Sequence, residues 1–343
     1  MSKADKVTVD KKNEFSYTKF REIDGQHPFQ KAAPEAVIEY NVRKRHGGKV
    51  LFFNFDLAIE MGLLPKNHPI KISAKLERQI LDTFSLVIIN EYDIDQGKKF
   101  PEKDIKKNKY MATRYLQLQH QSKMGTTSGD GRSIWNGNIT NRGITWDISS
   151  CGTGATALSP ATHIKGKFFE TGDPSISYGC GYFEKDEGME ALFFSEVLSQ
   201  NNFKTERILA IIEFSGGIAI SVRAHQNLLR PSHFFNHLKQ GNLEILKQIT
   251  NYFIERQEKN RFWQDVPQET NQRYEYFSDQ ILDDFSKTVA RFEDEYIFCW
   301  MDWDGDNILM DGGIIDYGSI RQFGLFHHQY RLSLAKYPAF LWV

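Results

Sequence analysis

Cysteine, net charge and long apolar runs are all scarce in this sequence. Its 343 residues include only three cysteines, Cys151, Cys180 and Cys299, without C-x-x-C spacing, which predicts a reducing compartment and argues against a disulfide framework or a zinc site. The formal net charge is -1, so no global basic field favours nucleic acid or an anionic membrane as a partner. The polar N-terminus lacks the apolar stretch of a signal peptide, and the longest apolar run, Tyr296 to Met301, is far too short to span a bilayer. These absences predict a cytoplasmic protein.

Aromatic residues, in contrast, are abundant, with 26 Phe and 14 Tyr. Such a content is typical of a well-packed globular enzyme rather than a disordered scaffold. The length allows two lobes or domains around a large buried core.

The apolar pattern changes along the chain and predicts an α+β fold. We expect a flexible lead-in over residues 1–35 and a β-rich lobe over residues 36–230, in which a helix interrupts the strands. A mainly helical lobe is expected over residues 231–343. Helical spacing predicts helices over residues 54–64, 75–92 (with 87–89 as an alternative strand), 187–199, 242–261 and 270–301. Alternation around Gly and Asn turns predicts antiparallel strand pairs at 133–135 with 144–148 and at 207–214 with 217–223. The lysine-rich run 96–109 is expected to be a solvated loop.

The most informative stretch lies near the C-terminus, from Asp302 to Tyr317. Two apolar pairs flank Asp311-Gly312-Gly313, which predicts a tight hairpin. That hairpin would bring Asp306-Asn307 and Asp316 to the same end. Two carboxylates and an amide oxygen form a hard, oxygen-only site that suits Mg²⁺ or Mn²⁺. Protein kinases order the same parts in the same way: a catalytic Asp, a metal-binding Asn and then a second metal-binding Asp.

Two other interpretations of this stretch were weighed. Asp and Gly favour surface turns for purely local reasons, so an ordinary turn is one alternative. An EF-hand loop starting at Asp302 is the other. It fails because Asn307 stands where the loop needs Gly and Gly313 stands where it needs a bidentate Glu.

Glycine-rich steps form a second signal. Gly129-Asp130-Gly131-Arg132 could turn two backbone N–H groups and a guanidinium toward an anion, although a plain hairpin turn has the same composition. Two further Gly-x-Gly steps follow, at Gly152 to Gly154 and at Gly179 to Gly181.

Together these motifs resemble those of the SelO (YdiU) family of pseudokinase-like protein adenylyltransferases. The matching residues run in order along the chain: Gly129-Asp130-Gly131-Arg132, Trp146-Asp147 leading to Gly152-Thr153-Gly154, Ser232-His233, Asp306-Asn307 and Asp316-Tyr317-Gly318. The resemblance covers roughly residues 110–318. It implies a protein-kinase-like two-lobed fold whose second lobe is shortened here.

The resemblance also implies an activity and a set of roles. Family members transfer AMP from ATP to protein hydroxyls, with ATP flipped relative to its position in kinases. Asp306 would be the general base, and Asn307 and Asp316 the metal ligands. The nucleotide-binding residues would be Gly129, Gly131, Arg132, Gly181, Arg223 and Arg230. Mg²⁺ or Mn²⁺ would be the cofactor, and ATP and proteins with Ser, Thr or Tyr the partners.

The sequence departs from the family at the phosphate-binding cations. Cys151 stands where the family has a Lys, and a thiol cannot supply that fixed charge. Lys165 or Lys167 is a candidate substitute, although a solvated loop lysine is the simpler interpretation. Gly179-Cys180-Gly181-Tyr182 lacks the acid and the arginine of the family's second Gly-Asp-Gly-Arg. Two other functions therefore stay open: a degenerate nucleotide-binding pseudoenzyme, and a kinase-like phosphoryl transferase.

Overall fold

The structure is a computed structural model that describes residues 15–117, 120, 123–294, 297–299, 304–318 and 320–322. For residues 297–299 and 320–322 only the backbone is considered. The expected mixture of helices and strands is confirmed, because the fold combines one large antiparallel sheet with helices. None of the helices in the described ranges is long and apolar enough to cross a membrane.

The large sheet is the centre of the fold. Its strands follow the order β1-β5-β6-β7-β10-β9-β3, and β8 pairs with β10 off this path. Neighbouring strands are antiparallel throughout. The strands are β1 (Val37–Tyr40), β3 (Lys49–Phe53), β5 (Tyr110–Thr113), β6 (Ser133–Asn141), β7 (Ile144–Cys151), β8 (Phe183–Glu184), β9 (Arg207–Glu213) and β10 (Ile218–His225). Two small pairs lie apart: β2 (Val42–Lys44) with β4 (Leu86–Ile88), and β11 (Ile297–Cys299) with β12 (Ile320–Gln322).

Both predicted antiparallel pairs are confirmed. Strands β6 and β7 pair from Ser133↔Cys151 to Asn141↔Ile144, and a tight turn with Gly143 at φ +81° joins them. Strands β9 and β10 pair from Ala219↔Glu213 onward. Isoleucine is the most frequent residue in these four strands, and its branched side chain suits a pleated, buried surface.

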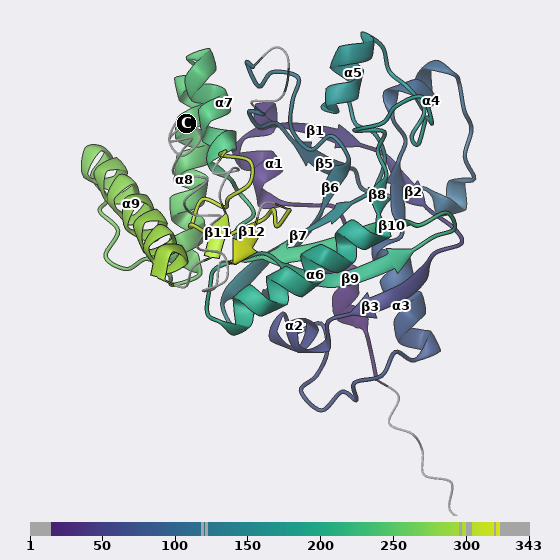
Figure 1. Ribbon diagram of the computed structural model, residues 1–343, viewed down its shortest axis with the longest axis horizontal. Helices are drawn as coiled ribbons and strands as arrows, with labels where there is room; N and C mark the ends of the chain where they lie inside the picture. Colours follow the sequence, from purple (N-terminus) through teal and green to yellow (C-terminus); the bar gives the residue numbers. More distant parts are fainter. Residues whose placement is uncertain are drawn as a thin grey trace, which may run out of the picture.

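Helices cover the sheet and gather at one of its ends (Figure 1). Helix α6 (Lys185–Gln200) packs on β9 and β10. Helices α7 (Pro231–Gln240), α8 (Leu243–Lys259) and α9 (Thr270–Asp294) lie together at the end beside β11 and β12. The remaining helices are α1 (Pro28–Ala32), α2 (Phe55–Glu60), α3 (Ala74–Phe84), α4 (Glu91–Asp95), α5 (Pro160–Lys165) and the 3-10 turns η1 (Thr18–Glu22), η2 (Pro34–Ala36) and η3 (Glu102–Asp104). The helices expected near 54–64, 187–199 and 242–261 are therefore confirmed as α2, α6 and α8.

The helix expected over residues 75–92 is shorter than predicted. It ends at Phe84, and residues 86–88 form the alternative strand, β4. The lysine-rich run after it is a loop with one short 3-10 turn, as expected.

The flexible lead-in expected over residues 1–35 is wrong for its second half. Phe20 and Phe29 are 1% and 0% exposed. The side chain of His27 caps α1 by accepting a hydrogen bond from the backbone N–H of Phe29, and Pro28 occupies the first helical position. Caps and proline fix these short elements locally, and burial of the two rings anchors them to the core. Residues 1–14 lie outside the described residues.

The helix expected over residues 270–301 also ends earlier than predicted. Helix α9 ends at Asp294, and β11 begins at Ile297. Acidic residues at the C-terminal end of a helix oppose its macrodipole, and this helix ends at Glu293-Asp294. The apolar segment that follows is rich in residues that favour strands.

Candidate functional site

The predicted acidic hairpin is present. Ile308 and Ile314 form an antiparallel bridge, and the N–H of Leu309 donates to the carbonyl of Gly313 at 2.6 Å. Gly312, at φ +80°, makes the turn. The N–H of Ile315 donates to the carbonyl of Asn307 at 3.3 Å. This pairing places Asp306-Asn307 and Asp316 at the same end of the hairpin, as the sequence predicted.

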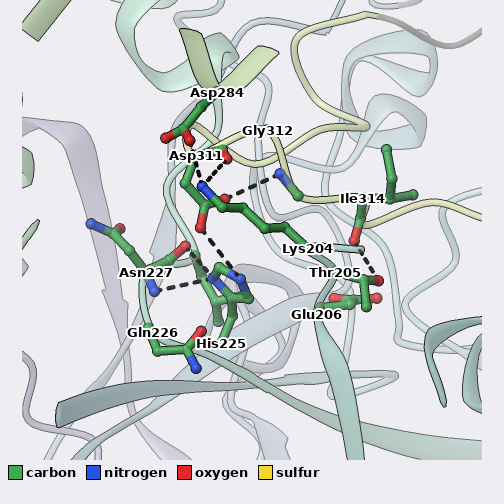
Figure 2. Close-up of polar contacts among 12 residues, drawn as sticks. Lys204, Thr205, Glu206, His225, Gln226, Asn227, Asp284, Asp311, Gly312 and Ile314 are labelled. Carbon is green, nitrogen blue, oxygen red and sulfur yellow. Dashed lines mark hydrogen bonds and ion pairs between the residues drawn. The ribbon is translucent and has the colours of Figure 1, made fainter. Parts of the chain in front are cut away.

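The tip of the hairpin is held by a polar cluster shown in Figure 2. Lys204 Nζ lies 2.7 Å from a carboxylate oxygen of Asp284 and donates to the carbonyl of Asp311 at 3.0 Å. The ring of His225 lies 3.6 Å from the Asp311 carboxylate. Because Lys204 comes from the segment before β9, Asp284 from α9 and His225 from β10, three distant parts of the chain fix one turn.

The returning arm of the hairpin pairs with the same segment. Thr205 and Ile314 form a parallel bridge, and the carbonyl of Ile314 accepts hydrogen bonds from the N–H of Glu206 and from Thr205 Oγ1, both at 3.0 Å. Tyr317, only 3% exposed, lies 2.7 Å through its hydroxyl from Thr205 Oγ1. The backbone of Asp316 is thus bracketed by two anchored residues.

A cavity of about 320 Å³ opens between the hairpin and the sheet. Its lining brings together residues from separate sequence motifs. The hairpin contributes Asp306, Asn307 and Asp316, the glycine-rich turns contribute Gly129, Gly131 and Gly179, and the predicted arginines Arg132, Arg223 and Arg230 complete the set. With the exception of Gly181, every candidate site residue lines this one cavity.

Each arginine is positioned by a different partner. Arg132 pairs with Glu187 of α6, with Nη1 3.0 Å from Oε2, and its guanidinium lies over the ring of Phe183 at 4.9 Å. Arg223 of β10 pairs with Glu206 at 3.2 Å. Side chains held in this way keep their charge in place before a ligand arrives, which lowers the entropic cost of gripping a polyphosphate.

Arg230 connects the cavity to the candidate base. Its Nη1 donates to the backbone carbonyl of Asp306 at 2.7 Å, and its guanidinium lies 4.8 Å from the ring centre of Tyr115. The N–H of Ser232 donates to the carbonyl of Gly305 at 2.9 Å. The turn that carries Asp306 is therefore fastened to the start of α7.

The first glycine-rich turn is shaped by a close approach of backbones. Gly129 has φ +152°, and a Cβ there would lie 2.1 Å from the carbonyl oxygen of Thr113. Asp130 points inward, not toward the cavity: its carboxylate accepts hydrogen bonds from Thr113 N, Thr113 Oγ1 and Trp135 Nε1. The glycines and Arg132 therefore face the cavity, while the acid between them stabilises the turn.

At position 181, glycine is explained by close packing of the backbone and not by contact with a ligand. It is absent from the cavity lining that the described residues form. Its φ is +92°, and a Cβ would lie 2.1 Å from the backbone nitrogen of Ala155. Only glycine tolerates that contact, so its role is to let the loop pack against Gly154-Ala155.

The cations of the cavity differ from those of the family motif. Cys151, 9% exposed, lines the cavity at the end of β7. Lys165 and Lys167, the candidate substitutes, are exposed and are not part of the described lining. Arg132 and Arg223 line the cavity together with the thiol.

A buried network stands behind the cavity. His233, 1% exposed, lies 2.9 Å through Nε2 from Thr113 Oγ1 and accepts a hydrogen bond at Nδ1 from the N–H of Arg230. Burial and the nearby Arg230 guanidinium hold its pKa well below the usual value, so the ring is neutral. His233 thereby connects the Asp130 turn to the Asp306 turn without reaching the cavity itself.

Asp147, the acid of the Trp146-Asp147 motif, is also structural. It is fully buried, and its carboxylate meets His27, Arg256 and the N–H of Leu228. These contacts join α1, α8 and the loop after β10 to the sheet.

The pKa values of two cavity residues, Glu206 and Tyr178, are shifted by burial and by the charges around them. Glu206 has its pKa raised to about 7, chiefly because it is buried; Arg223 opposes the rise and Asp316 adds to it. Burial also raises the pKa of Tyr178, and Asp306 and Asp316 are among the charges that add to that effect. Both hairpin carboxylates therefore act on the same part of the cavity.

The donor set of the hairpin fits a hard divalent cation. Five acids and three arginines line the cavity, so a polyphosphate would need additional positive charge there. No group of three or more His, Cys, Asp or Glu side chains able to hold a metal occurs in the described part of the chain. Mg²⁺ characteristically needs only one or two carboxylates, with phosphate oxygens and water completing its shell. Asp316, Asn307 and Asp306 provide such an incomplete, oxygen-only set.

Comparison with known proteins gives no independent assignment. No protein-family model matches this chain, and no curated protein matches it. The function of this chain is therefore inferred from the cavity and from the motifs that meet there.

Sequence reasoning missed several residues of the cavity. Tyr115, Tyr178, Glu187 and Glu206 all line it. Glu187 and Glu206 do not belong to any recognised sequence motif. Only the fold shows that each forms an ion pair with an arginine. Tyr178 directly precedes a Gly-x-Gly step, and this position was the one available signal.

Proposed function

We propose that the protein is a metal-dependent protein adenylyltransferase, which transfers AMP from ATP to Ser, Thr or Tyr hydroxyls of proteins. One observation carries the proposal: Asp306, Asn307 and Asp316 share a single cavity with Arg132, Arg223 and Arg230. A base, a metal-binding pair and several fixed cations are the parts that in-line nucleotidyl transfer requires.

Each residue has a role in this proposal. The carboxylate of Asp306 accepts the proton of the acceptor hydroxyl as its oxygen approaches the α-phosphorus. Arg132, Arg223 and Arg230 bind phosphate oxygens, and the link from Arg230 to the Asp306 carbonyl fixes the distance between phosphate and base. Asn307 and Asp316 would hold Mg²⁺ or Mn²⁺, which supplies charge neutralisation of the phosphates when bound.

The proposal extends to the fold. A protein-kinase-like arrangement would make the sheet of residues 36–230 the nucleotide lobe and the helices from residue 231 onward the second lobe. Support comes from the cavity, whose lining combines residues of the sheet with residues of the hairpin between α9 and β12. The order Asp306, Asn307, Asp316 along the chain agrees with this arrangement.

A second candidate is a nucleotide-binding protein without turnover. Cys151 favours it, because the cavity lacks a lysine at the position where the resembling family has one. Removing one preorganised donor typically costs about 10²- to 10³-fold in rate.

Parallel labelling with ATP carrying its label on the α- or the γ-phosphate distinguishes these functions. Wild type with Mg²⁺ or Mn²⁺ should incorporate the α-label into protein, and Asp316→Ala should not. Incorporation of only the γ-label would indicate phosphoryl transfer. A nucleotide-dependent rise in melting temperature without either label would indicate the pseudoenzyme.

A further inference from the structure

The cavity contains a hydroxyl group of its own that is placed as an acceptor. Five hydroxyl side chains line it: Tyr115, Ser133, Tyr178, Ser221 and Tyr317. Four of them are buried, at 3% to 6% exposure, whereas Tyr178 is 62% exposed. A large aromatic side chain at the mouth of a polar cavity is not explained by packing, since its burial contributes little to the core.

The loop that carries Tyr178 is firmly held on both sides. The N–H of Gly172 donates to the carbonyl of Cys180 at 2.7 Å, which closes the loop. Ser159 Oγ donates to the carbonyl of Gly179 at 2.6 Å, and Ile176 is buried in a cluster with Ala161 and Phe169. Anchored neighbours and an exposed ring mean that the loop presents the phenol rather than hiding it.

The charges around the phenol belong to the proposed reaction centre. Arg132, Glu187, Asp306 and Asp316 all influence the ionisation of Tyr178. Asp306 is the proposed base and Asp316 a proposed metal ligand, and both line the same cavity as Tyr178. Partial desolvation at the cavity wall and the nearby carboxylates raise the pKa of Tyr178.

The geometry points to Tyr178 as a site of intramolecular nucleotidylation, with a nucleoside triphosphate as donor. This inference rests on the proposed function. Tyr178 Oη attacks the α-phosphorus and forms an O–P bond. The bond from the α-phosphorus to the oxygen that bridges the α- and β-phosphates breaks, and pyrophosphate leaves with its electron pair. The phenolic proton passes to the Asp306 carboxylate. The product carries a nucleoside monophosphate on Tyr178 at the mouth of the cavity, where it obstructs entry of a second acceptor.

Labelling of the full chain by α-labelled ATP with Mn²⁺, followed by peptide mapping, tests the inference. Wild type should carry at most one label per chain, on the peptide that contains Tyr178. Tyr178→Phe, which removes one exposed oxygen and should melt at the same temperature as wild type, should lose about tenfold or more of the incorporated label. Label on other hydroxyls of wild type, with none on Tyr178, would overturn the inference and leave the proposed function standing; the ring would then serve only to stack on a base.

A mixing experiment tests whether the transfer is intramolecular. Wild type is incubated with isotopically heavy Asp316→Ala, which retains Tyr178 but lacks a metal ligand. Label should appear on Tyr178 of the light chain only, and its rate should not depend on protein concentration. Equal label on the heavy chain would overturn the intramolecular step. Absence of label from both chains and from an added tyrosine-containing peptide, without pyrophosphate release, would instead reject the proposed function together with this inference.

Discussion

The guanidinium of Arg230 donates a hydrogen bond from Nη1 to the backbone carbonyl of Asp306 at 2.7 Å, so a cavity cation and the candidate base are directly connected. The side chain of Arg230 also lies over Tyr115 and lines the cavity. One residue thereby positions the base and faces the ligand.

Arg230→Ala should lower the rate of α-label incorporation by about 10²-fold or more, because it removes a preorganised donor and loosens the Asp306 turn. The rate is measured with saturating nucleotide and metal. Arg78→Ala, which removes an exposed arginine from α3, is the matched control and should leave the rate unchanged. Equal rates for Arg230→Ala and Arg78→Ala would contradict the role of Arg230.

The raised pKa of Glu206 should make the free energy of unfolding depend on pH. Its pKa is raised to about 7 in the folded chain from its usual value of 4.5, chiefly by burial. Below pH 4.5 both folded and unfolded chains bind the proton, and the stabilisation is fully present. Between pH 4.5 and 7 the unfolded chain ionises first, so the stabilisation declines as pH rises and is absent above about pH 7, a change of up to about 3 kcal/mol.

Chemical denaturation of wild type and Glu206→Gln at several pH values measures this change. The unfolding free energy of wild type minus that of Glu206→Gln should fall by up to about 3 kcal/mol as pH rises through this interval. Glu190→Gln, which alters an exposed glutamate of the same cavity, is the control and should parallel wild type. A wild-type curve that also parallels Glu206→Gln would show that Glu206 does not titrate in this range.

Cys151 offers a gain-of-function test. Cys151→Lys places an ammonium group in the cavity between Arg132 and Arg223, and the rate of α-label incorporation should rise by about tenfold because a further cation stabilises the developing phosphate charge. Cys151→Met has a similar length without charge and should not increase the rate. The same increase in both variants would attribute the effect to side-chain size.

Replacing Lys204 tests whether its contacts at the tip of the hairpin hold the metal-binding end in place. Lys204→Ala removes the contacts with Asp284 and with the Asp311 carbonyl, and the free energy of unfolding should fall by about 1 kcal/mol. The metal-dependent rise in melting temperature should also become smaller. Lys287→Ala, which breaks a surface pair with Asp283 within α9, is the control. A metal response that Lys204→Ala leaves intact would show that the tip does not position the metal-binding end.

Local sequence patterns were sufficient for the strand pairs and the acidic hairpin. The Asp311-Gly312-Gly313 turn is a short-range signal, and once it is recognised the convergence of Asp306, Asn307 and Asp316 follows from strand register. Arg223 was a candidate because it lies near the Ser232-His233 motif, and the structure places it in the lining of the cavity. Features that depend on a few neighbouring residues can be read from the sequence.

Features that depend on distant neighbours could not be predicted in this way. The contact between Gly181 and Ala155 is visible only in the fold, so the glycine was taken for a ligand-binding residue. Phe20 and Phe29 anchor short turns without periodicity, which made the lead-in look unstructured. The apolar residues after Asp294 continued a helical pattern, although they form a strand. Tertiary contacts decided each of these cases.

The pairing of Thr205 with Ile314 has a consequence for how the protein responds to heat. The segment that carries Thr205 continues directly into β9, which lies between β10 and β3. Melting of β9 therefore also releases the acidic turn from its partner segment. Inactivation should occur no later than melting of the sheet as the temperature rises.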